Sequence, residues 1–170
     1  MTFARVPCSV FRKNGAKQDT ENGKRKTENE HTPMRLHLDI VTPEKQVFSD
    51  EVDFVYLPGA EGELGILPQH AALVTTLRPG ELRYGCRGDI GMLAVGGGFV
   101  EVAANRVLVL TDMALDEIEI DESKVQAAME RAEKALAGVS HATDAEEVAQ
   151  LQATIAKSMA QLNLKRKKRG

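Results

Sequence analysis

Tryptophan is missing from this 170-residue chain, and aromatic residues of all kinds make up only 4 % of it. The 42 % of hydrophobic residues must therefore build a core from aliphatic side chains. No apolar run reaches the roughly 18 residues that a membrane-spanning helix needs. The length favours one domain, or one domain with an appendage.

Cysteine is scarce as well. The two cysteines, Cys8 and Cys86, form no pair with the spacing of a zinc or redox motif. A reduced, intracellular compartment is the simpler interpretation. His/Cys clusters with metal-ligand spacing are missing, and so are the G-x-S-x-G, G-x-G-x-x-G and P-loop motifs. The sequence therefore gives no support to a metal site, a serine hydrolase or a phosphate cradle.

The net charge of −3 hides an uneven distribution. Residues 1–33 carry seven Lys/Arg and four Asp/Glu, residues 34–164 carry ten and twenty-one, and residues 165–169 read KRKKR. An acidic body argues against a nucleic-acid-binding domain, which presents a basic face. Blocks of like charge repel each other, so residues 165–170 are expected to be a solvated basic tail.

Residues 1–33 are expected to be a disordered, polar and basic extension. They lack the apolar segment of a secretory signal, and their acidic residues are unlike a transit peptide. Met34 opens the first patterned segment and is a candidate translation start. We assign no function to the extension.

Residues 34–115 show the two-residue period of β-strands. Three sets of alternating residues are each expected to share one face of a strand: Leu36, Leu38 and Ile40; Val52, Phe54 and Tyr56; and Leu82, Tyr84 and Cys86. The residues that alternate with the first set are expected to form its polar face: Arg35, His37 and Asp39. Turn signals separate the strands and no helical segment intervenes, which predicts an antiparallel β-sandwich or barrel.

Residues 116–164 switch to a helical period and predict an antiparallel two-helix hairpin. Apolar residues form two stripes: Val125, Ala128, Met129, Ala132 and Leu136, then Val148, Leu151, Ile155, Met159 and Leu162. Gly138 is a plausible helix stop, and Thr143 with Glu146 has the form of a capping box. Because the stripes are narrow and alanine-rich, the hairpin must pack on the sandwich or on a partner.

The segment GAEGELGILPQHAAL, residues 59–73, is the candidate functional region and is called the docking loop below. Its glycines at 59, 62 and 65 permit positive φ in tight turns, and Pro68 fixes the exit of the loop. The apolar residues Leu64, Ile66 and Leu67 are expected to anchor it to the core.

Three interpretations are open for the docking loop and the chain that contains it. A rigid loop that exposes a few polar groups loses little entropy on binding, and so suits a protein-docking surface. The candidate interface residues are Glu61, Gly62, Glu63, Leu64, Gly65 and His70. Acid–base catalysis by Glu61, Glu63 and His70 is the alternative, but no further motif supports it. A generic sandwich adaptor or ligand-binding module is a third possibility.

The sequence of these segments resembles that of a known protein family. RLHLDIVTPEKQVFSDEVDFVYLPGAE followed by GELGILPQHAALVTTLRPGEL is similar to the epsilon subunit of F-type ATP synthases. The resemblance continues through LAVGGGFVEVAANRVLVLTDMA and DEIEIDESKVQAAMERAEKAL, and covers residues 34 to about 164. Ala72 stands where the family pattern has proline after His-Ala.

The resemblance implies a ten-stranded β-sandwich followed by two antiparallel helices. It implies a non-catalytic subunit of the rotor's central stalk, bound to the gamma subunit and to the ring of membrane c-subunits, that supports ATP synthesis driven by an ion gradient. The docking loop would meet the ring or gamma. The location implied is the cytoplasmic face of a bacterial inner membrane, where the subunit would be peripheral.

The resemblance also implies that the helical hairpin regulates the complex. In its extended form the hairpin would reach the catalytic alpha and beta subunits and block ATP hydrolysis. The hairpin residues singled out are Asp121, Lys124, Met129, Ile155 and Met159. The basic segment 165–169 would reach acidic surfaces of the catalytic subunits.

Some members of the family bind ATP on the folded hairpin. Here Asp121 keeps the acidic position of that motif, but Lys124 stands where arginine is expected and Val125 where alanine is expected. The family motif also needs arginines on the second helix, but here the one basic residue between 144 and 164 is Lys157. Lysine lacks the forked guanidinium that grips phosphate, so tight ATP binding through Asp121 and Lys124 is not expected. Asp121 is equally explained as a helix N-cap.

Overall fold

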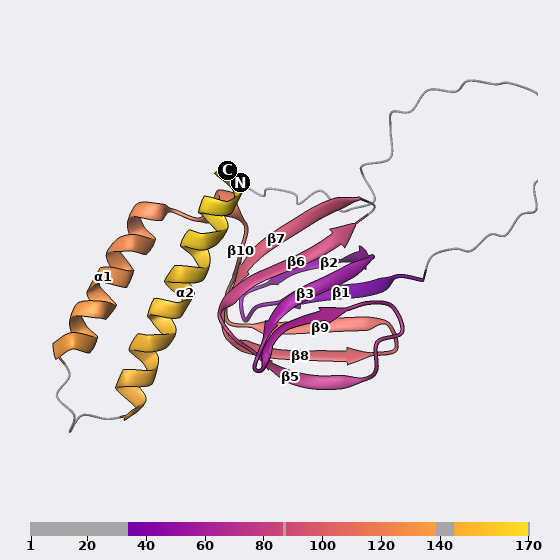
Figure 1. Cartoon of the computed structure of the whole chain (residues 1–170), viewed down its shortest axis with the longest axis horizontal. Coiled ribbons are helices and arrows are strands. Elements are labelled where there is room, and N and C mark those ends of the chain that lie inside the picture. The colour runs from indigo at the N-terminus through magenta and orange to yellow at the C-terminus, as the bar shows by residue number, and fades with distance from the viewer. Residues whose placement is uncertain (1–33, 87, 139–144, 170) are drawn as a thin grey trace, which may run out of the picture.

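The computed structural model describes residues 34–86, 88–138 and 145–169 and forms a β-sandwich followed by two helices (Figure 1). The strands are β1 Leu36–Val41, β2 Gln46–Val52, β3 Phe54–Gly59, β4 Gly62–Ile66, β5 Leu73–Leu77, β6 Gly80–Cys86, β7 Asp89–Val95, β8 Gly98–Ala103, β9 Arg106–Thr111 and β10 Ala114–Leu115. A 3₁₀ turn over Glu117–Glu119 leads into α1, Glu122–Gly138, and α2, Ala145–Arg169. The expected fold class, ten strands followed by a helical hairpin, is confirmed.

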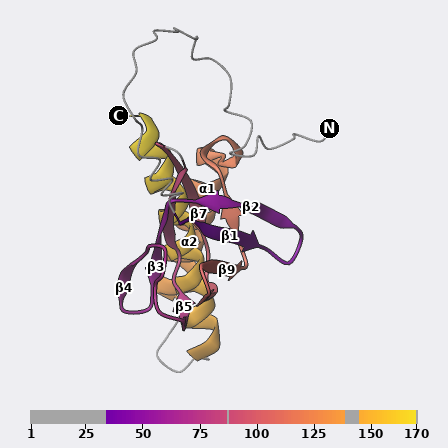
Figure 2. The same cartoon turned by 90° about the vertical axis from the view of Figure 1, so that its right-hand side faces the viewer.

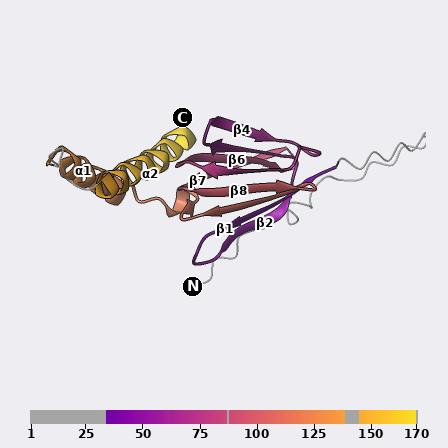
Figure 3. The ribbon, with the colours of Figure 1, turned by 90° about the horizontal axis from the view of Figure 1, so that it is seen from below.

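The ten strands form one curled sheet in the order β10-β7-β6-β3-β5-β8-β9-β1-β2, with β4 paired to β3 beside this path. Figure 3 shows the two layers that result, and Figure 2 shows the β1–β2 and β3–β4 hairpins on opposite sides of the sandwich. Across the layers, the ring of Phe48 in β2 lies 4.4 Å from that of Tyr84 in β6. Aliphatic side chains from the strands fill the space between the layers, as the lack of aromatic residues predicts.

One strand pair is parallel, which the sequence did not predict. β1 pairs with β9 in parallel from His37↔Arg106 to Val41↔Leu110, whereas the other pairs among the described strands are antiparallel. The pair joins the first strand to one that follows almost seventy residues later. Turn signals report only local hairpins, so they cannot reveal such a pairing.

The expected shared face of Val52, Phe54 and Tyr56 is wrong. Val52 is fully buried at the end of β2. The strand is interrupted at Asp53, and in β3 the buried residues are Val55 and Leu57. Phe54 and Tyr56 therefore lie on the outer face of β3, where their rings meet edge to face at 5.4 Å. A one-residue break between strands exchanges the inner and outer faces.

The set Leu36, Leu38 and Ile40 is fully buried, as expected. Asp39, expected on a polar face, does face outward from the core but is only 3 % exposed. Arg106 of the neighbouring β9 covers it. The alternation was predicted correctly, and the burial of the carboxylate was not.

The helices pack on each other, and α2 also packs on β6 and β7 of the sandwich (Figure 1). The stripe of α1 is confirmed, since all five residues are shielded and Ala132 is buried. In α2 the stripe is wrong at Met159, which is 49 % exposed, while Ser158, Ala160 and Leu164 are buried. Because α2 contacts two surfaces, its buried residues do not form a single stripe.

The basic segment 165–169 is not a separate tail, because α2 continues through it to Arg169. Lysine and arginine favour helix, and cations are stabilised near a helix C-terminus. The expectations for residues 1–33 and for the capping box at Thr143 lie outside the described residues, as does the face taken by the Cys86 side chain. No helix in the described ranges is long and apolar enough to cross a membrane.

Candidate functional site

The docking loop contains a strand and is not a single loop. β3 and β4 form a hairpin that pairs Gly59 with Gly62, so Ala60 and Glu61 form its tip. Gly62 has φ of +130°, which a side chain would resist, and it is the only one of the three glycines with positive φ. Gly65 is needed for space instead, since a Cβ there would lie 2.7 Å from the Tyr56 ring.

The apolar residues of the docking loop are divided between inside and outside. Ile66 is fully buried and Leu64 packs against the core. Leu67, expected to be an anchor, is 58 % exposed. The hairpin is therefore held through β4 itself, and the segment from Leu67 onward is available to solvent.

Glu63 is already paired within the chain. Its Oε1 accepts a hydrogen bond from Nη2 of Arg83 in β6. The Arg83 guanidinium also lies 5.3 Å above the Tyr56 ring and 3.4 Å from Oε1 of Glu81. By contrast, no hydrogen bond or ion pair joins exposed Glu61 to any other residue that the structure describes. The two carboxylates of the loop thus differ, with Glu61 free for a partner and Glu63 shared with β6.

His70 lies at the other end of β4 from Glu61. β4 has five residues, so its first and last Cα atoms are about 13 Å apart at 3.3 Å per step. The His70 backbone N–H donates to Leu67 O at 3.1 Å, and its Nδ1 lies 2.9 Å from Ala71 O. This separation removes the basis for a catalytic set of Glu61, Glu63 and His70, because acid–base partners must lie within hydrogen-bond reach.

The segment around His70 is fixed to the turn between β8 and β9. Gln69 has φ of +67°, and its backbone N–H donates to Oδ1 of Asn105 at 2.6 Å. Its side-chain amide also reaches Sδ of Met34 at 3.6 Å. The docking loop therefore presents two separate exposed groups, the Glu61 tip and the His70 segment, each held by a different part of the sandwich.

An exposed apolar patch, which sequence reasoning missed, lies on the outer face of β5, β8 and β9. Val74, Phe99 and Leu110 are 72 %, 58 % and 47 % exposed. Phe99 pairs directly with Leu110 across β8 and β9. Single exposed apolar residues are ordinary, but a cluster on one sheet face is typical of an interaction surface. Strand alternation provides the signal, because Val100, Val102, Val107 and Val109 occupy the inner face.

Asp39 is the centre of a polar network beside this patch. Arg106 donates from Nε and Nη2 to its Oδ2, at 3.0 and 2.7 Å, and Ser49 Oγ donates to its Oδ1 at 2.7 Å. Burial raises the pKa of the carboxyl, but the hydrogen bonds from Ser49 and Arg106 and the nearby His37 and Arg106 charges outweigh it, so the pKa is lowered. The network ties β1 to β2 and β9.

Asp121 is the N-cap of α1. Its Oδ1 accepts from Ser123 Oγ at 2.7 Å and from the backbone N–H groups of Ser123 and Lys124 at 3.2 and 3.3 Å. The Ser123 hydroxyl and then the Lys124 N–H lower the pKa of Asp121. Lys124 Nζ lies 3.3 Å from Oδ2 of the same carboxylate. The two residues of the ATP motif are thus engaged with each other and with the helix end.

α2 is attached to the sandwich mainly by polar contacts. Lys157 Nζ lies 2.5 Å from Oδ2 of Asp112, Gln161 donates to Sδ of Met113 at 2.8 Å, and Lys165 donates to Glu117 O at 2.8 Å. The apolar part of the contact is a small cluster in which the fully buried members are Ala94 and Leu164, with Ile120 at 4 % exposure. Leu164 is thus the main apolar anchor of α2.

At its C-terminal end α2 borders a cleft of about 650 Å³. The cleft lies between the β3–β4 hairpin, the start of β6 and α2, and its charged lining residues are Glu63, Arg78, Glu81, Arg83 and Lys167. Lys167 Nζ donates to Oε1 of Glu81 at 2.8 Å. The described residues contain no His, Cys, Asp and Glu cluster that could hold a metal ion.

Family comparison accounts for both parts of this architecture. Residues 35–117 match the β-sandwich domain of the ATP synthase delta/epsilon chain, and residues 119–165 match its long α-helix domain. The chain belongs to the ATP synthase delta/epsilon chain family. An epsilon chain from Desulforamulus reducens is 56 % identical over 58 % of this chain and 75 % of its own length. One from Bordetella avium is 43 % identical over 74 % of this chain and 88 % of its own.

Two solved structures share the fold. A chain in the Euglena gracilis mitochondrial ATP synthase, described as OSCP/F1/c-ring in rotational state 1, has a TM-score of 0.64 at 22 % identity. The alignment covers 89 % of this delta/epsilon family chain and 98 % of that one. A chain in the central stalk/c-ring structure of the Tetrahymena thermophila enzyme has a TM-score of 0.55 at 17 % identity, covering 78 % and 97 %.

Proposed function

We propose that this chain is a non-catalytic subunit of the central stalk of a rotary ATP synthase, where it joins the gamma subunit to the ring of c-subunits. The observation that carries the proposal is the match of both domains, in order, to the ATP synthase delta/epsilon chain. In this role the chain supports ATP synthesis driven by an ion gradient. It is a peripheral component at the cytoplasmic face of a bacterial inner membrane, in keeping with its bacterial relatives.

Two surfaces of the sandwich suit the two partners. The apolar patch of Val74, Phe99 and Leu110 fits a broad protein surface such as gamma. The hairpin tip with Glu61 and Glu63 is acidic and narrow, and fits polar, basic loops of the ring. Ion pairs at the rim of an interface set orientation more than affinity.

The helical hairpin acts in this proposal as a regulator of ATP hydrolysis. Its attachment to the sandwich has one fully buried large side chain, Leu164, whose burial contributes about 1.5–3 kcal/mol. The surface ion pairs add roughly 0–1 kcal/mol each. A folded and an extended arrangement can therefore differ by only a few kcal/mol, which is the condition for a switch. The extended hairpin would contact the catalytic alpha and beta subunits through the basic end of α2.

ATP is not assigned a role as a tightly bound ligand. Asp121 and Lys124, the residues at the motif positions, already cap α1 and pair with each other. A bound nucleotide would have to break these contacts, and Lys124 offers a point charge without the forked geometry of arginine.

The test compares the full chain with a chain cut after Leu115, added to a catalytic hexamer that contains gamma. The cut keeps β10, which pairs with β7. We expect both chains to bind gamma and only the full chain to lower ATP hydrolysis, and binding is also the control for folding of the shorter chain. If both chains bind and neither changes the rate of ATP hydrolysis, the stalk role stands and the inhibitory role of the hairpin is refuted. Failure of the full chain to bind would refute the stalk role.

A further inference from the structure

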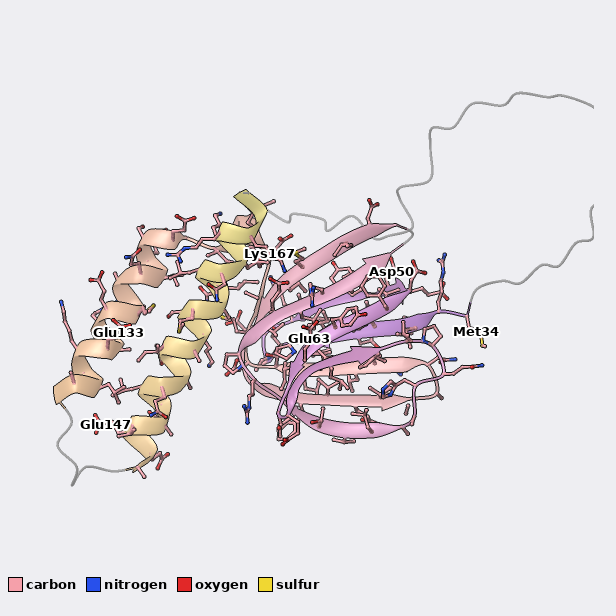
Figure 4. All side chains as sticks on the ribbon, viewed as in Figure 1. Met34, Asp50, Glu63, Glu133, Glu147 and Lys167 are labelled. Atoms are coloured by element: carbon pink, nitrogen blue, oxygen red, sulfur yellow. The ribbon has the colours of Figure 1, made fainter. Side chains whose placement is uncertain are left out.

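The cleft at the end of α2 contains two charged groups that each have two partners. Arg83 is shared by two carboxylates, with Nη2 bonded to Glu63 and Nε 3.4 Å from Glu81. Glu81 is shared by two cations, Arg83 and Lys167, the latter at 2.8 Å. Figure 4 marks both ends of this series, Glu63 on the sandwich and Lys167 on α2. The four residues are called the ionic relay below.

We propose that the ionic relay couples the docking loop to α2, so that a cationic group of a partner at Glu63 favours release of α2 from the sandwich. The identity of that partner rests on the proposed function, but the coupling is a property of the chain alone. Among the described residues no hydrogen bond or ion pair joins Glu63 to α2 directly, so the chain of bonded side chains from Glu63 to α2 runs through Arg83 and Glu81.

The direction of the coupling follows from competition. When a partner cation occupies Glu63, Arg83 loses its Glu63 partner and turns fully to Glu81. Glu81 then binds Lys167 less strongly, because Arg83 offers the better geometry for a carboxylate. In reverse, departure of α2 leaves Glu81 to Arg83 and frees Glu63 for a partner. Coupling between two sites is reciprocal, so both descriptions give one coupling constant.

The expected size of the effect is modest. The side chains of the relay are between 21 % and 55 % exposed, so each pair is partly screened by water. A change in one such pair alters an equilibrium by about twofold to fivefold. This is sufficient to matter, because Leu164 is the only large side chain that is fully buried among the α2 residues whose burial the structure describes.

The test measures opening of α2 in the isolated full-length chain, from the hydrogen-exchange rates of the amides of residues 155–164. Glu63→Gln should raise opening about twofold to fivefold, because it removes the carboxylate that competes for Arg83. Arg83→Gln should lower opening, because Lys167 then has Glu81 to itself. Lys167→Gln should raise opening, and adding Glu63→Gln to it should have no further effect. Half-molar salt should reduce all these differences, since it screens surface charges.

Glu61→Gln is the matched control, because it removes the same charge from the same hairpin but lies outside the relay. Equal exchange in Glu63→Gln and Glu61→Gln would overturn the proposal. So would an increase in opening with Arg83→Gln, since that result means that Arg83 only supports the fold. Unchanged thermal unfolding temperatures of the variants establish that the sandwich is intact.

A second stage adds the detergent-solubilised ring with gamma to the full chain. Exchange in α2 should rise at least twofold upon binding, and unchanged exchange in a chain that co-purifies with the ring would refute the partner step. Absence of co-purification would instead refute the proposed function, while the variants of the isolated chain still decide the coupling. The two failures are therefore distinguishable.

Discussion

Arg106 holds Asp39 through two hydrogen bonds to a single carboxylate oxygen, Oδ2, at 3.0 and 2.7 Å. The two residues lie diagonally across the parallel pair of β1 and β9, because Arg106 is opposite His37 and Asp39 is opposite Leu108. Only 4 % of the Asp39 side chain is exposed, whereas 64 % of the Arg106 side chain is. The arginine therefore covers the carboxylate from outside.

Asp39→Asn should destabilise the chain by about 1–3 kcal/mol, because charged hydrogen bonds to a buried group are replaced by weaker ones. The measurement is urea unfolding at neutral pH. Glu101→Gln, an exposed change on the neighbouring β8, is the control and should stay within about 0.5 kcal/mol of the parent. A loss no larger than that of the control would show that the network adds nothing.

The same network predicts how stability depends on pH. The pKa of Asp39 is lowered in the folded state from its ordinary value of 3.8. The contribution of the Asp39 carboxylate to folding stability is therefore fully present above pH 3.8. It is lost as the pH falls through the lower pKa of the folded state. We expect the free energy of unfolding to fall less steeply below pH 4 in Asp39→Asn than in the parent. Parallel curves for the two proteins would contradict this.

Two glycine-to-alanine substitutions should differ sharply in their effect on the stability of the folded chain. At Gly98 a Cβ would lie 1.9 Å from the backbone oxygen of Leu110, and backbone cannot move aside easily. Gly98→Ala should therefore cost more than about 2 kcal/mol through overpacking. At Gly138, the last residue of α1, no atom lies within 4 Å of a Cβ, so Gly138→Ala should be neutral or stabilise by up to about 1 kcal/mol. Thermal unfolding of both variants decides the comparison.

The apolar patch predicts a binding defect without a folding defect. Phe99→Ser should weaken binding to gamma by roughly tenfold or more, since aromatic residues contribute strongly at interfaces. Its 58 % exposure means that stability should change little. Ile118→Ser, an 88 % exposed residue outside the patch, is the control. Titration of immobilised gamma with each chain provides the affinities, and equal affinities would exclude the patch from the interface.

Millimolar ATP should leave the unfolding temperature of the chain unchanged, because Asp121 and Lys124 are engaged in capping α1. A ligand that binds only the folded state stabilises it by RT ln(1 + L/Kd), where L is the free ligand concentration, so the unfolding temperature rises with ligand concentration. Differential scanning fluorimetry with and without ATP makes the measurement. A concentration-dependent rise that Lys124→Ala abolishes would restore ATP as a ligand.

The sequence predicted what depends on neighbouring residues. Alternation placed Leu36, Leu38 and Ile40 in the core, and helical spacing placed Ala132 between the helices. The predictions failed where a segment distant in sequence determines whether a side chain is buried or exposed. Asp39 is buried because Arg106 lies beside it, and Met159 is exposed while its neighbours Ser158 and Ala160 are buried. Glu63 was assigned correctly to an exposed loop, but its bond to Arg83 depends on a strand pairing that local patterns do not specify.

The parallel pairing of β1 with β9 also bears on how the chain reaches its native state during synthesis. At about 5–20 residues per second, Arg106 leaves the ribosome roughly 3 to 14 seconds after its partner His37. During that interval β1 can pair only with β2, and its other edge stays open. Such non-local contacts slow folding and leave an unpaired strand edge available to other chains. The sheet can close only after most of the sandwich has been made, and the helices then follow.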